Sequence, residues 1–256
     1  MSDQKEKAER FSALHVKGDP VILFNIWDAG GARAVAEAGA KAIATGSHSV
    51  AVANGYDDGQ QVPLEFVLDN IARIVASVVL PVTLDFEGGY ATDADGLKSN
   101  IAKVIETGAI GINFEDQIVG GEGMYSVEQQ QTRIAAVREA ADSKSIPLFI
   151  NARTDVFLKN GPVTHGEYFD EAVVRAGAYA EAGASGLFAP GLKDPELIRR
   201  LCDLSPLPVN IMVMPDTPSN QEMAALGVAR ISYGPGPYRT MIQSLKLAAA
   251  NAFNLG

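Results

Sequence analysis

Short apolar segments recur about every 30 residues along the chain, and a longer alanine-rich segment with amphipathic spacing follows each of them. The short segments are rich in Val and Ile and are bounded by Gly or Pro, which is typical of strands buried in a parallel sheet. The expected strands cover residues 21–27, 42–47, 81–87, 111–117, 147–154, 186–191, 208–215 and 229–234. The expected helices cover residues 30–38, 63–77, 94–107, 126–142, 166–182, 194–203, 218–226 and 236–252. This alternation predicts parallel strands joined by crossover helices.

Eight strand and helix pairs favour closure into a (β/α)8 TIM barrel, because an open doubly wound sheet commonly has only about five or six strands. Three expected helices end in the similar segments AEAGAKA, IETGAIG and AEAGASG, in which Gly39, Gly108 and Gly183 suit a left-handed cap. A length of 256 residues suits one such barrel, so we expect a single domain over residues 1–256. No GxGxxG or Walker A segment follows the first strand, which argues against a nucleotide-binding fold.

The composition narrows the class of partner. Hydrophobic residues make up 47% of the chain, charged residues 20%, and the formal net charge is −10. A chain this acidic lacks the basic surface that binds nucleic acid or anionic lipid, so neither partner is expected. The first residues lack the apolar core of a signal peptide, and no run of about 18 apolar residues could span a bilayer, which predicts a cytoplasmic protein. The single cysteine, Cys202, is predicted to be a buried structural thiol in a helix.

Polar residues gather where the expected strands end. In a barrel of this kind, these strand ends and the loops after them form the active site. An ionised carboxylate at the end of an apolar strand is costly unless it is paired, hydrogen-bonded or bound to a metal. The candidate residues are Asp28, Thr45, Gly46, Ser47, Asp85, Glu87, Glu115, Asp116, Arg153, Asp155 and Asn210.

The alternation of side chains along a strand separates these candidates. Asp85 and Glu87 share one face, and we expect both to point into the barrel mouth. Glu115 and Asp116 are neighbours that cannot both point inward, and Glu115 is favoured as the inward one. Arg153 is expected in the same mouth, where a guanidinium suits bidentate binding of a substrate carboxylate. The alternative for Arg153 is a structural salt bridge to a neighbouring carboxylate.

The candidate metal ligands, Asp85, Glu87 and Glu115, all offer oxygen atoms. Hard oxygen ligands suit Mg²⁺ or Mn²⁺, with water molecules completing the coordination shell. The chain has no HExxH or CxxC motif, and its three histidines do not cluster. His48 and His165 fall in expected loops, where we predict that they are solvated and not catalytic. A Mg²⁺ or Mn²⁺ site is therefore predicted at the barrel mouth.

At these positions the chain resembles the isocitrate lyase and phosphoenolpyruvate mutase superfamily. The resemblance runs through most of the length and is carried by FNIWDAGGARAVAEAGAKAIATGS, PVTLDFEGGY, INFEDQ, INARTD and PVNIM. It implies a barrel that binds Mg²⁺ and a small 2-oxo or 2-hydroxy acid. It implies an enzyme that cleaves or forms a C–C or P–C bond next to a pyruvate-like or glyoxylate-like unit. It also implies a homo-oligomer, a dimer or tetramer, that exchanges its last helix between subunits.

The resemblance also implies roles for individual residues. The substrate-binding positions are Thr45, Gly46 and Ser47, whose backbone holds a carboxylate, and Asp85, Arg153 and Asn210. The metal ligands are Asp85, Glu87 and Glu115. The catalytic positions are Asp58, Glu115 and Arg153. Asp57 stands directly before Asp58, so the register of that loop stays open.

The loop after the fourth expected strand departs from the family pattern. It reads IVGGEGMYSVEQ and lacks the Lys-Arg-Cys-Gly-His segment of the lyases, whose cysteine acts in acid–base catalysis. It also lacks the Lys and Asn of the longer gating loop of the phosphonate mutase. The Pro-Glu of the lyases at the end of the sixth strand is replaced by Ala189-Pro190. Tyr125 or Glu122 is the candidate replacement for the missing acid, on position alone.

These features together predict a Mg²⁺-dependent carbon–carbon lyase that acts on a small 2-oxo or 2-hydroxy di- or tricarboxylic acid of the isocitrate or methylisocitrate type. Cleavage would pass through an enolate stabilised by the metal. Two alternatives within the superfamily remain: decarboxylation of an oxaloacetate-like acid, and hydrolysis of a C–C or P–C bond. A non-catalytic protein that binds oxo acids is the alternative of another class. The apolar residues of the last helix, 236–252, are expected to pack on a second copy of the chain.

Overall fold

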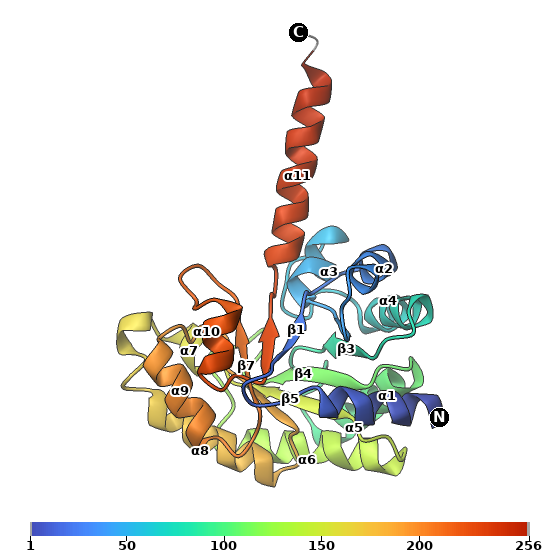
Figure 1. Cartoon of the computed structure of the whole chain (residues 1–256). Helices are drawn as coiled ribbons and strands as arrows, with labels where there is room; N and C mark the ends of the chain where they lie inside the picture. Colours follow the sequence, from blue (N-terminus) through green and yellow to red (C-terminus); the bar gives the residue numbers. More distant parts are fainter. Residues whose placement is uncertain (1, 255–256) are drawn as a thin grey trace.

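The computed structural model describes residues 2–254, and in this part eight parallel strands form one sheet in the order β1-β8-β7-β6-β5-β4-β3-β2 (Figure 1). The strands are β1 (Val21–Leu23), β2 (Ile43–Ala44), β3 (Val82–Asp85), β4 (Gly111–Glu115), β5 (Phe149–Arg153), β6 (Gly186–Phe188), β7 (Val209–Met212) and β8 (Arg230–Ser232). All eight expected strands are confirmed. Each ends earlier than expected, because the chain leaves the sheet at its carboxyl edge to form loops. Residues 1, 255 and 256 of the expected single domain lie outside this description.

The sheet closes into a barrel through a short seam between β1 and β2. Ile26 and Thr45 form an isolated parallel bridge beyond the two strands. The Ile26 N–H donates to the carbonyl of Ala44 at 2.9 Å, and the Gly46 N–H donates to the carbonyl of Ile26 at 3.1 Å. The expected (β/α)8 barrel is thus confirmed in a nearly closed form.

Helices surround the strands as expected. The helices are α1 (Ser2–Ala13), α2 (Ala29–Glu37), α3 (Ser47–Ala53), α4 (Leu64–Ser77), α5 (Ala94–Glu106), α6 (Val127–Ser143), α7 (Val156–Lys159), η1 (Pro162–Thr164), α8 (Phe169–Glu181), α9 (Pro195–Leu204), α10 (Asn220–Ala225) and α11 (Gly236–Phe253). The eight expected helices are all present. The sequence pattern missed α1, α3, α7 and η1, which do not connect successive strands in a regular repeat.

Helix α1 covers the amino-terminal end of the barrel. Its mainly charged sequence buries Ala8 and Phe11, and the Phe11 ring packs edge-on against Phe149 of β5 with centroids 5.3 Å apart. The His15 ring, just after the helix, stacks on Phe149 at 4.0 Å. These rings plug one end of the barrel, so the opposite end is left for a site.

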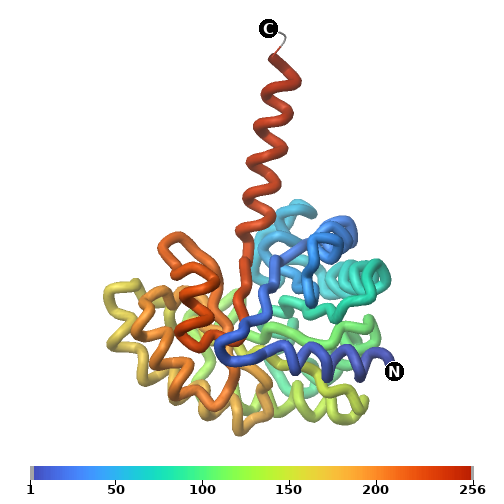
Figure 2. The backbone as a smooth tube through the Cα atoms, in the orientation of Figure 1, coloured from blue at the N-terminus to red at the C-terminus, as the bar shows by residue number. Residues whose placement is uncertain are grey.

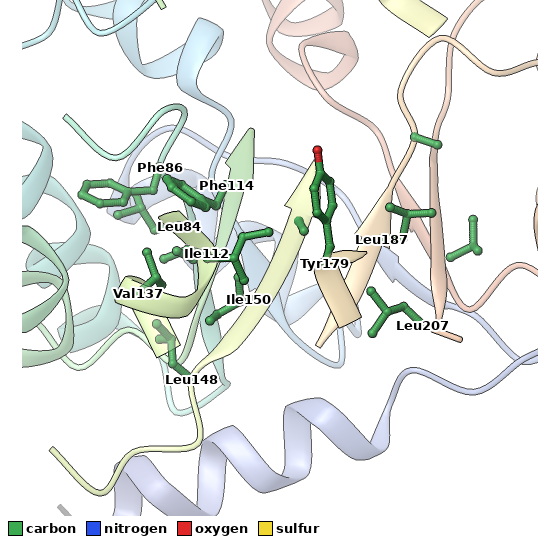
Figure 3. Packing of buried hydrophobic residues seen from close by; sticks show 14 of the residues in the cluster. Leu84, Phe86, Ile112, Phe114, Val137, Leu148, Ile150, Tyr179, Leu187 and Leu207 are labelled. Carbon is green, nitrogen blue, oxygen red and sulfur yellow. The ribbon is translucent and has the colours of Figure 1, made fainter. Parts of the chain in front are cut away.

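The main hydrophobic core lies between the strands and the outer helices (Figure 3). Leu84 and Phe86 on the third strand and its extension, and Ile112 and Phe114 on β4, are all buried there. Full burial of a side chain of this size contributes roughly 1.5–3 kcal/mol. Because side chains alternate along a strand, this outward apolar row directs Asp85 and its neighbours to the barrel mouth.

Helix α11 projects away from the barrel (Figures 1 and 2). Its first turn is anchored, because Tyr238 is buried and packs edge-on against Trp27 with ring centroids 5.0 Å apart. Farther along, Leu245, Leu247 and Phe253 are 59%, 65% and 80% exposed. None of the described helices, α11 included, is long and apolar enough to cross a membrane.

Candidate functional site

A cavity of about 200 Å³ opens at the carboxyl ends of the strands. Its polar lining residues are Asn25, Ser47, His48, Asp58, Asp85, Asn113, Arg153, Ser232 and Arg239. Its apolar wall includes Leu158, Phe188, Pro190, Met212 and Pro235. The cavity thus brings residues from all eight strands or their following loops to the end of the barrel where active sites of this fold lie.

Asp85 ends β3 and is held on three sides. Its backbone N–H donates to Oγ1 of Thr45 at 2.9 Å. Its Oδ2 accepts from the backbone N–H of Ser47 at 3.0 Å, and its Oδ1 accepts from Nδ2 of Asn113 at 3.4 Å. Both carboxylate oxygens accept hydrogen bonds, which fix the direction of the carboxylate at the cavity.

Glu87 lies two residues farther along, beyond the end of β3, and does not line the cavity. It has a left-handed backbone with φ of 50°, which is uncommon for a residue other than glycine. Its Oε2 accepts from the backbone N–H of Gln60 at 2.8 Å, and the Tyr90 hydroxyl donates to Oε1 at 3.4 Å. Burial, and then the charges of Asp85 and Asp58, raise the pKa of Glu87 to about 7.

Glu115 and Arg153 face each other across β4 and β5. Nη1 of Arg153 lies 2.8 Å from Oε2 of Glu115. Nε and Nη2 of the same arginine donate to Oδ1 and Oδ2 of Asp155 at 2.6 and 3.0 Å. The structural salt bridges that were the alternative reading of Arg153 are therefore present. The arginine also lines the cavity, and these contacts use three of its five N–H groups.

Burial raises the pKa of Glu115 to about 8, an effect larger than the opposing one of Arg153. Asp116, the next residue, points away from the cavity, as the strand alternation predicts. Its Oδ2 accepts from the Tyr179 hydroxyl at 2.7 Å and lies 3.1 Å from Nη1 of Arg175. Asp116 therefore ties β4 to α8 and is not part of the site.

The donor set suits a hard cation. Within residues 2–254 no three His, Cys, Asp or Glu side chains stand close enough to hold a metal ion between them. Asp85 is the strand-end carboxylate that lines the cavity, together with Asp58 from a loop, whereas Glu87 and Glu115 are bound to protein partners beside it. Mg²⁺ commonly uses one or two carboxylates and keeps several waters, so this arrangement fits Mg²⁺ with Asp85 as the direct ligand.

The backbone expected to hold a substrate carboxylate is already engaged. The N–H groups of Thr45 and Gly46 donate to the carbonyls of Thr83 and Ile26, and that of Ser47 donates to Asp85. These amides are engaged because the segment forms the barrel seam and the start of α3, and their binding of a substrate carboxylate stays a prediction. Gly46 and Ser47 of this segment line the cavity.

Asn210 does not reach the cavity. It is fully buried, and its amide exchanges hydrogen bonds of 3.1 Å with the Ser232 hydroxyl inside the barrel. Met212, two residues later on the same face, lines the cavity instead. Asn210 thus lies one layer below the cavity lining, and its role in substrate binding stays a prediction.

Of the loop residues Asp58, Tyr125 and Glu122, Asp58 alone lines the cavity. Asp58 lines the cavity with 3.8 Å between its Oδ2 and Nδ1 of His48, whereas Asp57 does not line it. Tyr125 does not line it, because its ring packs against the Arg133 guanidinium at 4.1 Å outside the barrel. Glu122 is exposed and likewise absent from the described cavity lining. Neither residue is placed to replace the missing lyase acid.

Cys202 and His165 lie outside the set of candidate site residues, and both are buried. Cys202 is buried, and burial raises the pKa of its thiol to about 12, as suits the predicted structural role. His165 is not solvated as expected. It is 2% exposed, and its Nε2 lies 2.9 Å from the Phe157 carbonyl, so it packs the loop after β5.

The sequence analysis missed Asn113 and Arg230, and also Asn25, Ser232 and Arg239 of the cavity lining. Arg230, on β8, is 1% exposed inside the barrel, and its Nη2 donates to Oδ1 of Asn113 at 3.0 Å. Burial lowers the pKa of this arginine to about 9. Asn113 was detectable, because it stands two residues before Glu115 and shares its face. Arg230 was detectable too, because it is a charged residue within the apolar strand segment VARIS and faces inward.

Comparisons with known proteins show which family this chain is similar to. The profile of the family described as phosphoenolpyruvate phosphomutase matches residues 11–253. The chain is 29% identical to 2-methylisocitrate lyase of Escherichia coli (strain K12), over 96% of this chain and 82% of that protein. A crystal structure from Burkholderia cenocepacia J2315, provisionally described as a phosphonomutase, is 47% identical with a TM-score of 0.95. That alignment covers 97% of this chain and 99% of the other.

A more distant solved structure, phosphonopyruvate hydrolase in complex with oxalate and Mg²⁺, is 21% identical with a TM-score of 0.84. The alignment covers 96% of this chain and 86% of that one, which shows a shared fold. The profile match over nearly the whole length and the close structural likeness agree with the barrel and its cavity. The chain belongs to the phosphoenolpyruvate phosphomutase family, within the isocitrate lyase superfamily of lyases and mutases.

Proposed function

We propose that this protein is a Mg²⁺-dependent lyase that cleaves a C–C bond in a small 2-oxo or 2-hydroxy di- or tricarboxylic acid. The observation that carries the proposal is one cavity that contains Asp85, a ligand for a cation, beside Arg153 and Ser47, donors for an anion. The likeness to 2-methylisocitrate lyase supports C–C cleavage. The Mg²⁺ and oxalate bound to phosphonopyruvate hydrolase support the metal and an acid of this size.

Asp85 is the proposed direct ligand of Mg²⁺, and Glu87 and Glu115 are proposed to act through water. Mn²⁺ prefers the same oxygen ligands and would serve in its place. When bound, the cation supplies positive charge at the oxo and carboxylate oxygens of the substrate. Asp85 supplies compensating negative charge without a thiol or imidazole ligand, and a bound cation would favour the ionised forms of Glu87 and Glu115, whose pKa values burial raises.

Arg153 and Ser47 are the proposed carboxylate-binding groups. The ion pairs of Arg153 with Glu115 and Asp155 fix its guanidinium, and its remaining N–H groups are free to bind an anion. Negative charge that develops on the substrate during cleavage then meets a positive charge that is already oriented. Such preorganisation is commonly the largest contribution to catalysis.

Asp58 is the proposed acid–base group, at the cavity mouth beside His48. In a 2-hydroxy acid it would take the hydroxyl proton while the C–O bond becomes a carbonyl and the electrons of the breaking C–C bond leave as an enolate. The same proton then returns to the enolate carbon. Decarboxylation of an oxaloacetate-like acid needs less of this help and is the second candidate; hydrolysis of a C–C or P–C bond, with Asp58 activating water, is the third.

A substrate panel tests the proposal. Methylisocitrate, isocitrate, oxaloacetate and phosphonopyruvate are assayed with and without EDTA. We expect one of the tricarboxylic acids to be cleaved, with activity lost in EDTA and restored by Mg²⁺. Asp85→Ala should lose both activity and Mg²⁺ binding, and an active Asp85→Ala variant would overturn the metal site. Mg²⁺-dependent binding of oxalate without turnover of any acid would instead favour the non-catalytic binding protein.

We also propose a homo-oligomer, a dimer or tetramer, in which α11 packs on another subunit. The support is the projecting course of α11 and the exposure of Leu245, Leu247 and Phe253 on it. Apolar side chains that no part of residues 2–254 covers, such as these beyond the anchored first turn of α11, are costly in water.

A further inference from the structure

Arg133 of α6 lies outside the barrel, yet it holds the turn that follows the third strand. Its Nη2 donates to the carbonyl of Gly88 at 2.6 Å. Its Nη1 donates to the carbonyls of Ala91 and Thr92 at 3.1 and 3.0 Å. One guanidinium thus binds three carbonyls of a single five-residue turn, residues 88–92.

That turn carries unusual backbone. Glu87 and Tyr90 have left-handed φ values of 50° and 56°, and both are residues with full side chains. Such conformations persist only where surrounding contacts hold them. Glu87 begins the turn, and the side chain of Tyr90 within it donates to Glu87. The direction of the Glu87 carboxylate therefore depends on the turn that Arg133 holds.

A second contact of Arg133, through Gln130, reaches the backbone of β4. Nε of Arg133 donates to Oε1 of Gln130 at 3.1 Å, and Nε2 of Gln130 donates to the carbonyl of Glu115 at 3.1 Å. Gln130 and Arg133 are three residues apart on α6 and so lie on one helix face. One side-chain pair therefore contacts the backbone beside both Glu87 and Glu115.

Burying the charged guanidinium of Arg133 costs free energy, because the charge leaves water. Arg133 is 5% exposed, and burial lowers its pKa, since its described partners are carbonyls, an amide and the rings of Phe114 and Tyr125 but no carboxylate. A buried cation without a carboxylate partner is rarely kept for stability alone. The planar fork of arginine, by contrast, can bind several carbonyls in fixed directions.

We propose that Arg133, with Gln130, is a positioning residue that sets Mg²⁺ affinity by fixing Glu87 and Glu115 from outside the barrel. The inference rests on the proposed metal site. Residues that orient metal ligands commonly change metal affinity by about 10–100-fold when they are replaced.

The test measures Mg²⁺ affinity by titration calorimetry and the melting temperature of each folded variant. Arg133→Met should weaken Mg²⁺ binding about 10–100-fold, and Arg133→Lys should fall between it and the wild type because Lys cannot bind all three carbonyls at once. Arg138→Met is the matched control. Arg138 also lies on α6 and donates to carbonyls, those of Gly183 and Leu148, but near the opposite end of the barrel. The Arg138→Met substitution should lower the melting temperature while the Mg²⁺ affinity stays the same.

A second pair of variants covers the case in which Arg133→Met fails to fold. Gln130→Met should weaken Mg²⁺ binding, whereas Gln131→Met should not, since Gln131 donates to the Ala178 carbonyl on α8. Equal Mg²⁺ affinity in the Gln130 and Gln131 variants, or in the Arg133 and Arg138 variants, would overturn the positioning role. A wild-type protein that binds no Mg²⁺ would instead overturn the proposed function itself.

Discussion

Asp57 and Asp58 are adjacent, exposed and chemically identical, yet only Asp58 lines the cavity. At the scale of single residues, strand alternation predicted correctly that Glu115 faces Arg153 and that Asp116 turns away. It did not predict depth along the barrel axis, so Asn210 was expected at the cavity although it lies one layer below. Depth depends on where each strand starts relative to its neighbours, and a single sequence does not contain that register.

Replacing Asp58 tests the assignment of the acid–base group. Asp58→Ala should lower kcat by about 10²–10⁴-fold, the usual effect of losing such a group. Asp57→Ala removes the same charge from the same loop and should leave kcat within about twofold, since acid–base help is lost only at the cavity. Steady-state kinetics on the best substrate of the panel make the comparison. Equal losses in the two variants would show that loop charge, and not a positioned carboxylate, matters.

His15 predicts a dependence of stability on pH. Burial, and then the Arg230 charge, lower its pKa from 6.5 to about 3, while Nδ1 bonds to the Phe11 carbonyl and Nε2 is buried without a partner. Between these pH values the unfolded chain binds a proton that the folded chain does not. Stability from this residue is therefore present above about pH 6.5 and falls as the pH is lowered, by up to about 1.4 kcal/mol per pH unit.

Urea unfolding of wild type and His15→Gln at pH 5 and pH 7 measures this contribution. The wild type should lose more unfolding free energy than the variant between the two pH values. A wild type and variant that lose the same amount would contradict a neutral buried imidazole. The comparison cancels the other titrating groups, which both proteins share.

At the scale of elements, the helix ends were predicted more accurately than the strand ends. Gly39, Gly108 and Gly183 have φ of 98°, 91° and 96°, as the cap pattern requires. Cap residues act locally, so a single sequence reveals them. Helix α1 was missed because its charged pattern resembles a solvated segment, and its contribution comes from Phe11 and the ring of Phe149, which is distant in sequence.

The glycine caps can be compared with one another. A Cβ at Gly39 would meet nothing within 4 Å, whereas a Cβ at Gly183 would lie 2.8 Å from Cγ of Arg138. Gly39→Ala should cost about 1–2 kcal/mol of unfolding free energy for the left-handed backbone alone. Gly183→Ala should cost more, because Arg138 must also move. Denaturant unfolding measures both, and equal costs would show that Arg138 yields freely.

At the scale of the whole molecule, the barrel forms within one chain, whereas α11 projects from it with exposed apolar side chains. The wild type should sediment and scatter light as a dimer or tetramer. Leu245→Glu with Leu247→Glu should shift it to the monomer, because both exposed apolar side chains would then carry charge into the contact. Lys246→Glu changes charge at the position between them and serves as the control. A monomeric wild type would contradict the proposed packing of α11.

The seam between Ile26 and Thr45 gives the cavity a second property. Asn25 and Gly234 line it from one side of the seam, and Gly46 and Ser47 from the other. A ligand in the cavity therefore bridges two edges that are otherwise joined by a short bridge and by the Asn25 side chain, which donates to the Thr45 carbonyl at 2.7 Å. Amide hydrogen exchange at Gly46, whose N–H closes the seam, should slow as the cavity fills. Exchange at this seam thus becomes an internal measure of whether the cavity is occupied.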